Sequence, residues 1–321
     1  MSDLSRSSLL DRVVARTGAR RVIDVRPVQS LWSGYGEILR VRLEGGEHAS
    51  VVVKHVRPPS MEGDHAARRS HARKLRSYEV ERAWYRHHAA RCDDSCRVAR
   101  CFAADRDDAG WLFVLEDLDA AGFPSRRRSL SDAEIDACLS WLASFHATFV
   151  HRARETSPAD LWPQGTYWHL ATRQDELGAM PRGALRDAAT EIDTALEAGT
   201  HRTLVHGDAK PANFCFGPAS VAAVDFQYVG GGCGMKDVVY FFSCLGKARC
   251  ERAAEGWLDT YFVALRRALP ASLDGAALEQ EWRALVPFAW ADLERFLAGW
   301  SPGHHDRYAA AMTRRALAAL A

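Results

Sequence analysis

Polar and apolar residues alternate over residues 30–56 in the manner of paired strands. A period of two places successive side chains on opposite faces of a strand, so residues 38–43 and 50–56 are predicted to be strands. Gly45 and Gly46 lie between them and favour a tight hairpin turn. The pattern therefore predicts a β-hairpin that opens a sheet.

The next stretch, residues 57–77, is strongly basic. It has no acidic residue after Asp64, and it begins with a proline pair. Its basic side chains are Arg68, Arg69, Arg73, Lys74 and Arg76. We interpret this stretch as a solvated loop that enters a helix, with its charges on a surface face.

A helical pattern follows, in which Tyr78, Glu81 and Tyr85 share one face at i, i+3 and i+7. This spacing places a carboxylate within an otherwise aromatic stripe. Burial of an unpaired charge is costly, so Glu81 is expected to have a partner of opposite charge.

Residues 111–115 form an apolar run suited to a buried strand, and residues 116–119, three of which are acidic, end it abruptly. We place the boundary between two lobes there. Residues 1–118 are assigned to an N-terminal lobe and residues 119–321 to a C-terminal lobe.

Helical patterns dominate the second lobe. Ser131 and Glu134 form a Ser-x-x-Glu capping pattern at the start of a long helix over residues 131–150. The exception is residues 203–229, where short strand-like runs alternate with turns. These runs are residues 204–205, 214–216 and 221–224.

Composition and charge mainly exclude certain classes of function. In 321 residues, 47% hydrophobic and 26% charged, there is enough apolar material for one large core or two modest ones. The formal net charge of +1 gives no overall attraction to nucleic acid or an anionic membrane. A nucleic-acid role would need a local patch, and residues 68–76 contain no interleaved aromatic residue and no recognition motif.

No targeting or membrane segment is predicted. Charged residues interrupt the first 20 residues and leave no room for the apolar region of a signal peptide. The longest apolar run, residues 238–245, is less than half of a bilayer span. We therefore expect a cytosolic protein without a membrane partner.

The eight cysteines are expected to be free thiols, because a long chain without an export signal has no need of disulfides. Cys92, Cys96 and Cys101 lie near His87 and His88, which suggests zinc. The spacing contains no CxxC pair, so ordinary thiols are the favoured interpretation.

The chemical signal is concentrated around His206, Gly207 and Asp208, with Asn213 five residues after the aspartate and Asp225 across a hairpin turn. Phosphoryl transfer needs a carboxylate that accepts a hydroxyl proton and oxygen ligands for the magnesium that bridges the phosphates. One loop can supply the base and one ligand from Asp208 and Asn213. The second aspartate can supply the other ligand.

This segment resembles the protein-kinase-like superfamily, whose catalytic loop has the form H-x-D-x-x-x-x-N followed by a D-F-G-type motif. Residues 206–208 match the His-Gly-Asp of aminoglycoside phosphotransferases and choline kinases. Residues 224–227 and 115–118 resemble ecdysteroid-kinase-like members.

The resemblance implies an α+β, two-lobed fold, with a small antiparallel-sheet N-lobe, a larger helical C-lobe and a nucleotide cleft between them. It implies an ATP-dependent phosphotransferase that uses Mg²⁺ and acts on a small-molecule hydroxyl. The resemblance further implies that Asp208 is the base, that Asn213 and Asp225 hold the metal, and that His206 braces the loop.

The superfamily also places a lysine on the third strand, and Lys54 stands at that point. It should contact the α- and β-phosphates and pair with a glutamate of the following helix, for which Glu81 is the candidate and Glu79 the alternative. Glu116 and Leu118 fall where the cofactor would meet the junction of the lobes. The phosphate-covering turn is assigned to Ser33, Gly34, Tyr35 and Gly36.

Departures from the protein kinases narrow the expected substrate. Gly207 replaces an arginine, Gln227 replaces a glycine, and no A-P-E segment follows, so protein substrates are not expected. Lys210, two residues past the base, could neutralise the transferring phosphoryl group and is included among the catalytic residues.

A second glycine cluster, residues 230–234, precedes Lys236 but lacks the G-K-[ST] ending of a P-loop. The next residue, Asp237, takes the place where the resemblance implies a buried brace for the catalytic loop.

The partner is expected to be a small alcohol or amino alcohol. Trp290 with Asp292 and Glu294 could form an aromatic cage for an amine, although core packing is the favoured role for any one tryptophan. The identity of the acceptor, ATP or GTP preference and the oligomeric state stay open. The alternative function is a catalytically silent nucleotide-binding relative.

Overall fold

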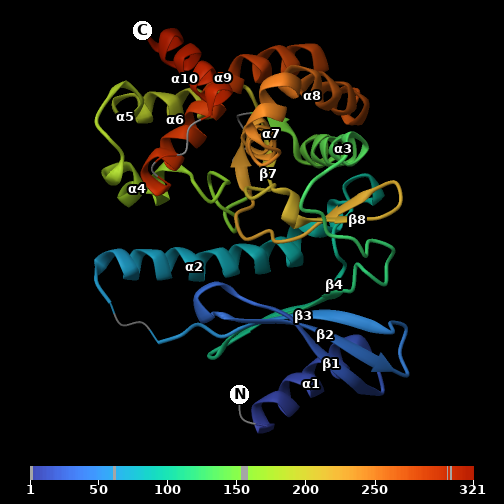
Figure 1. Cartoon of the computed structure of the whole chain (residues 1–321). Helices are drawn as coiled ribbons and strands as arrows, with labels where there is room; N and C mark the ends of the chain where they lie inside the picture. The colour runs from blue at the N-terminus through green and yellow to red at the C-terminus, as the bar shows by residue number, and fades with distance from the viewer. Residues whose placement is uncertain (1–2, 61–62, 153–157, 302, 304–305) are drawn as a thin grey trace.

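The computed structural model describes residues 3–60, 63–152, 158–301, 303 and 306–321. A small lobe is built on an antiparallel sheet, and a larger lobe is mainly helical (Figure 1). The mixed helix-and-sheet class predicted from the sequence is confirmed.

The sheet lobe contains five strands in the order β1-β2-β3-β5-β4, and every neighbouring pair is antiparallel. The strands are β1 (Arg21–Ser30), β2 (Gly36–Glu44), β3 (Ser50–Val56), β4 (Cys101–Asp107) and β5 (Gly110–Glu116). The strands predicted over residues 38–43, 50–56 and 111–115 are confirmed. β1 is an edge strand with mostly exposed side chains, so it has no buried alternation by which to predict it.

The helix α1 (Asp3–Thr17) covers one face of the sheet. Leu9 and Val13 pack with Leu39 and Val53 in a small apolar cluster. The larger cluster of the molecule lies on the other side of the sheet and extends into the helical lobe, where it includes Trp84, Phe113 and Phe226. The sheet is therefore buried on both faces.

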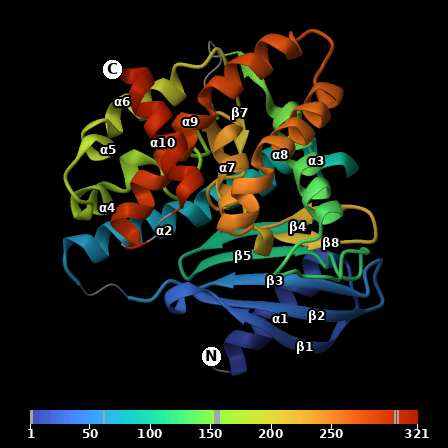
Figure 2. The same cartoon turned by 45° about the horizontal axis from the view of Figure 1, so that its top comes forward.

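The helix α2 (His65–Ala83) crosses the molecule between the sheet and the helical lobe (Figures 1 and 2), and a π-helical turn (Trp84–His88) continues it. Tyr78, Glu81 and Tyr85 are all buried, as their helical spacing predicts.

Residues 57–77 enter a helix as predicted, since residues from His65 onward are helical. The expectation of a solvated face is wrong in part, because three arginines at i, i+4 and i+7 share a face that contacts the helical lobe. These contacts are Arg69 with the Asp175 carboxylate (2.5 Å), Arg73 with the Thr172 carbonyl (2.9 Å) and Arg76 with the Leu161 carbonyl (3.0 Å).

The helical lobe contains the remaining α-helices of the described residues. They are α3 (Asp132–Phe149), α4 (Gln174–Ala179), α5 (Ala184–Asp187), α6 (Ala189–Glu197), α7 (Met235–Ser243), α8 (Lys247–Ala268), α9 (Gly275–Trp300) and α10 (Arg307–Leu320). The short 3-10 turns of the chain are η1 (Trp32–Gly34), η3 (Ala89–Arg91), η4 (Asp94–Cys96), η5 (Leu170–Thr172) and η6 (Pro211–Asn213).

The predicted helix over residues 131–150 is α3, and Ser131 and Glu134 form the expected reciprocal capping box at its start. Short strands carry the predicted runs of residues 203–229. They are β7 (His201–Val205) between β6 (His151–Arg152) and β10 (Gly230–Gly232), and the hairpin of β8 (Phe214–Phe216) with β9 (Val221–Ala223). The candidate catalytic segment is thus held between two small pieces of sheet.

β5 ends at Glu116, directly before the proposed boundary between residues 118 and 119. The location of that boundary stays a prediction. Among the described residues, no helix combines the length and the apolar character needed to cross a bilayer.

Candidate active site

A pocket of roughly 540 Å³ lies between the sheet and the helical lobe. Several residues predicted from the sequence line it together, although they come from distant parts of the chain. These residues are Lys54, Glu81, Glu116, Leu118, Asn213 and Asp225. The fold therefore brings the strand lysine, the helix glutamate and the two candidate metal ligands to one place.

Asp208 is buried at the end of β7, and its carboxylate accepts hydrogen bonds from three side chains. Lys210 Nζ donates to Oδ2 (2.8 Å), Asn213 Nδ2 donates to Oδ2 (3.0 Å), and Tyr240 OH donates to Oδ1 (3.1 Å). A carboxylate offers about four acceptor positions, so a further donor such as a substrate hydroxyl can be accommodated.

Burial raises the pKa of Asp208, although the Lys210 ammonium group opposes that shift. A carboxylate with a raised pKa is a stronger base than an ordinary surface aspartate. The site therefore suits acceptance of a proton at Asp208.

The catalytic loop is fixed from beneath by Asp237 of α7. Its Oδ2 accepts from His206 N (2.6 Å), and its Oδ1 accepts from Gly207 N (2.9 Å). His206 donates from Nε2 to the Val224 carbonyl (3.0 Å) and accepts at Nδ1 from Asp208 N (3.2 Å). These hydrogen bonds are the contacts that the bracing roles predicted for His206 and Asp237 require.

The backbone explains the glycine that separates His206 from Asp208. Gly207 has φ +81°, and a Cβ there would lie 2.1 Å from the Tyr228 carbonyl oxygen. Only glycine fits this left-handed, closely packed position. The departure from the arginine of protein kinases is thus a requirement of this loop.

Asp225 follows β9 with φ +69°, which is strained for a residue with a side chain. Its Oδ1 has no hydrogen-bond partner among the described residues and lies 3.5 Å from Lys54 Nζ. Burial acts to raise the pKa of Asp225, but the Lys54 and Lys210 ammonium groups outweigh it and lower that pKa. An ionised oxygen without a donor, held in place by backbone strain, fits a metal ligand.

Asn213, in the 3-10 turn η6, is the second candidate metal ligand beside Asp225. Its amide nitrogen donates to the Asp208 carbonyl (2.9 Å) as well as to the Asp208 carboxylate, which leaves the amide oxygen as the atom suited to a cation. Asn213 and Asp225 are the residues present that could hold magnesium.

Lys54 of β3 and Glu81 of α2 form the predicted buried ion pair. Nζ lies 2.6 Å and 2.9 Å from the two carboxylate oxygens. Although burial opposes it, Glu81 raises the pKa of Lys54, which keeps the ammonium charged. Glu79 is not the partner, because it contacts Trp111 and Arg106 on another face of the helix.

The predicted phosphate-covering turn lies where β1 leads into β2. Gly36 has φ +135°, and a Cβ there would meet the His55 carbonyl oxygen at 2.0 Å. Ser33 and Gly34 have left-handed backbones in η1. The Tyr35 side chain is buried against His71 and Tyr78, so of this residue only the backbone is available to a phosphate.

Sequence reasoning missed several residues at the site. Tyr240 contacts the base, and Lys74 and Trp32 line the pocket, with Trp32 83% exposed. Gln227 accepts a hydrogen bond from Ser77 Oγ (3.2 Å) beside Glu81. The helical spacing of Lys74 to Glu81 could have indicated the lysine, whereas the Tyr240 contact joins segments 32 residues apart and left no local signal.

The proposed aromatic cage is not formed. Trp290 is 1% exposed, and Asp292 is occupied by Arg295 Nη2 (2.6 Å) and Trp168 Nε1 (3.2 Å). Trp168 and Trp282 are also buried. These tryptophans pack the core of the helical lobe, which confirms the favoured alternative.

Comparison with protein families gives one match. The model described as the phosphotransferase enzyme family matches residues 33–275, about three quarters of the chain. No curated protein matches it.

Solved structures of similar fold include three kinases, each 16% identical to this chain. An amicoumacin kinase in complex with AMP-PNP and Ca²⁺ has a TM-score of 0.51 and covers 99% of this chain and 95% of its own. A microcompartment-associated aminopropanol kinase has a TM-score of 0.50, with coverages of 98% and 94%. An aminoglycoside phosphotransferase from Streptomyces rimosus has a TM-score of 0.50, with coverages of 92% and 99%. At this identity the likeness shows a shared fold, and it confirms the predicted kinase-like class.

Proposed function

The chain belongs to the phosphotransferase enzyme family, and from that premise we propose that it transfers the γ-phosphoryl group of ATP to a hydroxyl of a small molecule. The family membership supports phosphotransferase activity as such. The nucleotide, the acceptor and the residue roles are the parts that we propose.

The observation that carries the proposal is the environment of Asp208. A buried carboxylate with a raised pKa lies within hydrogen-bond reach of Lys210, and it shares Asn213 with the candidate metal site. A structural aspartate would need none of these arrangements together. Phosphoryl transfer would use each of them, because the acceptor must lose a proton close to the phosphate charge.

Each residue then has a task. Lys54, held by Glu81, positions the α- and β-phosphates, and Asp208 accepts the proton of the acceptor hydroxyl. Lys210 offsets the charge of the transferring group. Asn213 and Asp225 would hold magnesium, which supplies charge neutralisation between the β- and γ-phosphates when bound.

We propose a small alcohol or amino alcohol as acceptor, in keeping with the aminopropanol kinase of similar fold. The lobe boundary between residues 118 and 119, and a cytosolic location, belong to the same proposal. A silent nucleotide-binding protein is the alternative, but the occupied positions of Lys54, Asp208, Asn213 and Asp225 favour catalysis.

The test is a screen of alcohols, amino alcohols and aminoglycosides for acceptor-stimulated ADP release, with GTP in parallel. Asp208→Asn is the matched blank, and we expect it to lower kcat at least a hundredfold, since a general base contributes roughly 10² to 10⁴. Nucleotide affinity should change little. Near-normal turnover by Asp208→Asn would remove Asp208 from the mechanism.

Asp225→Ala tests the proposed metal ligand by a separate measurement. Calorimetry should show loss of Mg·ATP binding, because the carboxylate that would join the ion to the phosphates is gone. If the wild type binds Mg·ATP but no acceptor stimulates ADP release, the silent alternative is supported.

A further inference from the structure

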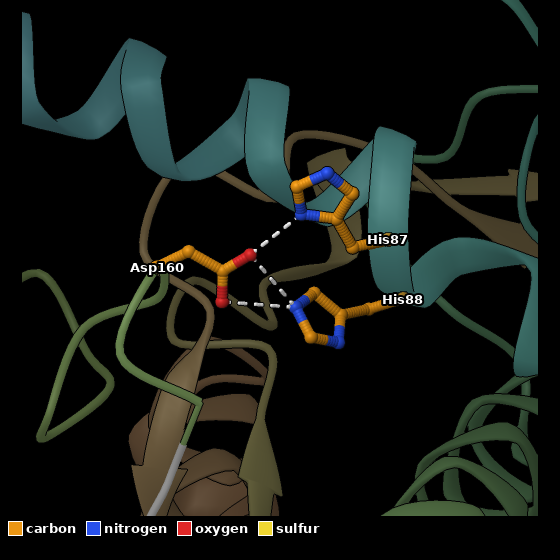
Figure 3. A group of neighbouring side chains, drawn as sticks. All are labelled: His87, His88 and Asp160. Carbon is orange, nitrogen blue, oxygen red and sulfur yellow. Dashed lines mark hydrogen bonds and ion pairs between the residues drawn. The ribbon is translucent and has the colours of Figure 1, made fainter.

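Three metal-ligating side chains gather outside the nucleotide pocket, where the end of the α2 segment meets the helical lobe (Figure 3). His87 Nδ1 lies 2.8 Å from Asp160 Oδ2, and His88 Nε2 lies 3.1 Å from Asp160 Oδ1. The candidate ligand atoms are all within 4.8 Å of one another. In the described part of the chain this is the one such group of three or more His, Cys, Asp or Glu side chains.

The two histidines converge on one carboxylate even though they are neighbours in sequence. In an α-helix consecutive side chains point about 100° apart, because there are 3.6 residues per turn. Here both residues lie in the π-helical turn Trp84–His88. His87 uses its near nitrogen and His88 its far nitrogen, and both rings turn toward Asp160 (Figure 3). π-Helical turns of this kind are frequent at functional sites.

The ligands are positioned by further contacts. Arg76 Nη2 donates to the main-chain oxygens of Asp160 (3.4 Å) and Leu161 (3.0 Å), which fixes the segment that carries the carboxylate. Trp84 stacks on the His88 ring, with an interplanar angle of 20°. Little conformational freedom is left to be lost when a ligand binds, which favours affinity.

We propose that His87, His88 and Asp160 bind one divalent transition-metal ion, with Zn²⁺ as the principal candidate and water at the remaining position. Two imidazole nitrogens and one carboxylate oxygen suit zinc and its neighbours, whereas magnesium and calcium prefer oxygen ligands. Tetrahedral zinc at its usual bond lengths separates neighbouring ligand atoms by about 3.4 Å. His87 Nδ1 and His88 Nε2 lie 2.8 Å and 3.1 Å from the Asp160 oxygens, so these ligand atoms need to separate by only about 0.3–0.6 Å to reach that value.

Access from solvent agrees with this assignment. The side chain of His87 is 54% exposed and that of Asp160 35% exposed, which leaves a path from solvent. Neither histidine nor Asp160 lines the nucleotide pocket, so the site is separate from the proposed magnesium ligands.

The ion would join the two lobes and act on the active site from a distance. Trp84, which stacks on His88, also stacks on Phe226 with ring centroids 4.5 Å apart, and Phe226 follows Asp225. The π-helical turn begins three residues after Glu81. A structural role is therefore assigned, in which zinc stabilises the junction that holds both Glu81 and Asp225.

Titration calorimetry of the metal-stripped full-length protein with Zn²⁺ tests the proposal. We expect one ion per chain, and affinity at least tenfold weaker in Asp160→Asn and in His87→Ala, since each removes a ligand. The half-exposed ring of His87 makes that variant a safe second test if Asp160→Asn fails to fold. His48→Gln, a histidine of the sheet lobe, is the matched control and should bind as the wild type does.

Two readouts separate this site from the thiols. Co²⁺ bound by nitrogen and oxygen should show no thiolate charge-transfer absorption, whereas binding at Cys92 or Cys96 would show it. Zinc should raise the Tm of the wild type and not that of Asp160→Asn, by linkage. Unchanged zinc affinity in both ligand variants, a thiolate band, or no binding by the wild type would overturn the site and leave a hydrogen-bonded clasp only. The assay needs no nucleotide or acceptor, so its outcome is independent of the proposed function.

Discussion

The two lobes differ in how deeply their charged side chains are buried. In the sheet lobe most ion pairs lie at the surface, such as Arg21 with Glu44, whose side chains are 65% and 34% exposed. In the helical lobe charged groups lie inside the core, where Asp237, Asp292 and Arg295 are each exposed by 1% or less. Among the residues that the structure describes, the sheet lobe has one ion pair of comparable burial, Lys54 with Glu81.

This difference shows where polar burial has a purpose. Surface pairs in water contribute little to stability, whereas a buried charge must be compensated by nearby partners. For Asp237 of the helical lobe those partners are backbone N–H groups of the candidate catalytic loop, so compensation also fixes that loop. Asp292 and Arg295 compensate each other within the core. In the sheet lobe compensation fixes the lysine that is assigned to the phosphates. Asp237 and Lys54 therefore place buried charge beside the candidate active site from both lobes.

The largest expected effect is at Asp237. Asp237→Ala should lower the free energy of unfolding by about 3 kcal/mol or more, because two buried N–H groups lose their acceptor and His146 loses its partner. Denaturant unfolding measures this loss. Asp237→Asn keeps one acceptor oxygen and should lose less. If Asp237→Ala had the same unfolding midpoint as the wild type, the contacts of this buried charge would not stabilise the helical lobe, and the contrast with the surface pairs would be wrong.

The second test concerns the buried pair of the sheet lobe. Lys54→Met and Glu81→Gln should each lower kcat/KM for nucleotide, by about tenfold or more for the lysine and less for the glutamate. The pair is in direct contact, so a double-mutant cycle should give a coupling energy of about 1–3 kcal/mol. Glu79→Gln is the control on the same helix. Additive effects of the two changes would mean that the residues act separately.

The third prediction concerns the pH dependence of stability that Glu294 of the helical lobe should cause. Burial, with a smaller effect of Asp306, raises the pKa of Glu294 to about 7. The folded state therefore holds a proton that the unfolded state releases at lower pH, and stability should fall as pH rises from the ordinary value of 4.5 towards 7.

Glu294→Gln should remove this decline. We expect a gain on the order of 1 kcal/mol at pH 8 and little change at pH 5, measured by urea unfolding at both values. The exposed Glu251 on α8 provides the control, since Glu251→Gln should alter neither. If the stability of the wild type and that of Glu294→Gln changed by the same amount between pH 5 and pH 7, the assignment of the decline to Glu294 would be contradicted.

The smallest effect is expected at the surface of the sheet lobe. Glu44→Gln disrupts the pairs with Arg20 and Arg21, and both arginines are largely exposed. Solvent and salt screen such pairs, so Tm should not change measurably. Scanning calorimetry at low and physiological salt checks this. A large fall in Tm would show that surface pairs in this lobe do hold the fold.

Local pattern was sufficient for much of the fold. The strand alternation, the Ser131 capping pattern and the placement of Glu81 in an aromatic stripe all survive in the structure, because each depends on the periodicity of one element. The motif around Asp208 was also recognisable, since its loop fixes the spacing of base and ligand. The ion pair of Lys54 with Glu81 followed from the resemblance, and the cost of burying Glu81 without a partner supported it.

The sequence by itself thus determined the class of fold and the residue types of the site. Only the tertiary structure decided that the basic face of α2 contacts the helical lobe, that Tyr240 donates to Asp208, and that Asp160 meets His87 and His88. The tertiary structure likewise decided that Trp168, Trp282 and Trp290 pack in the core. These contacts join segments that are distant in the chain, and their energies depend on packing between elements, which the periodicity of any single element does not encode.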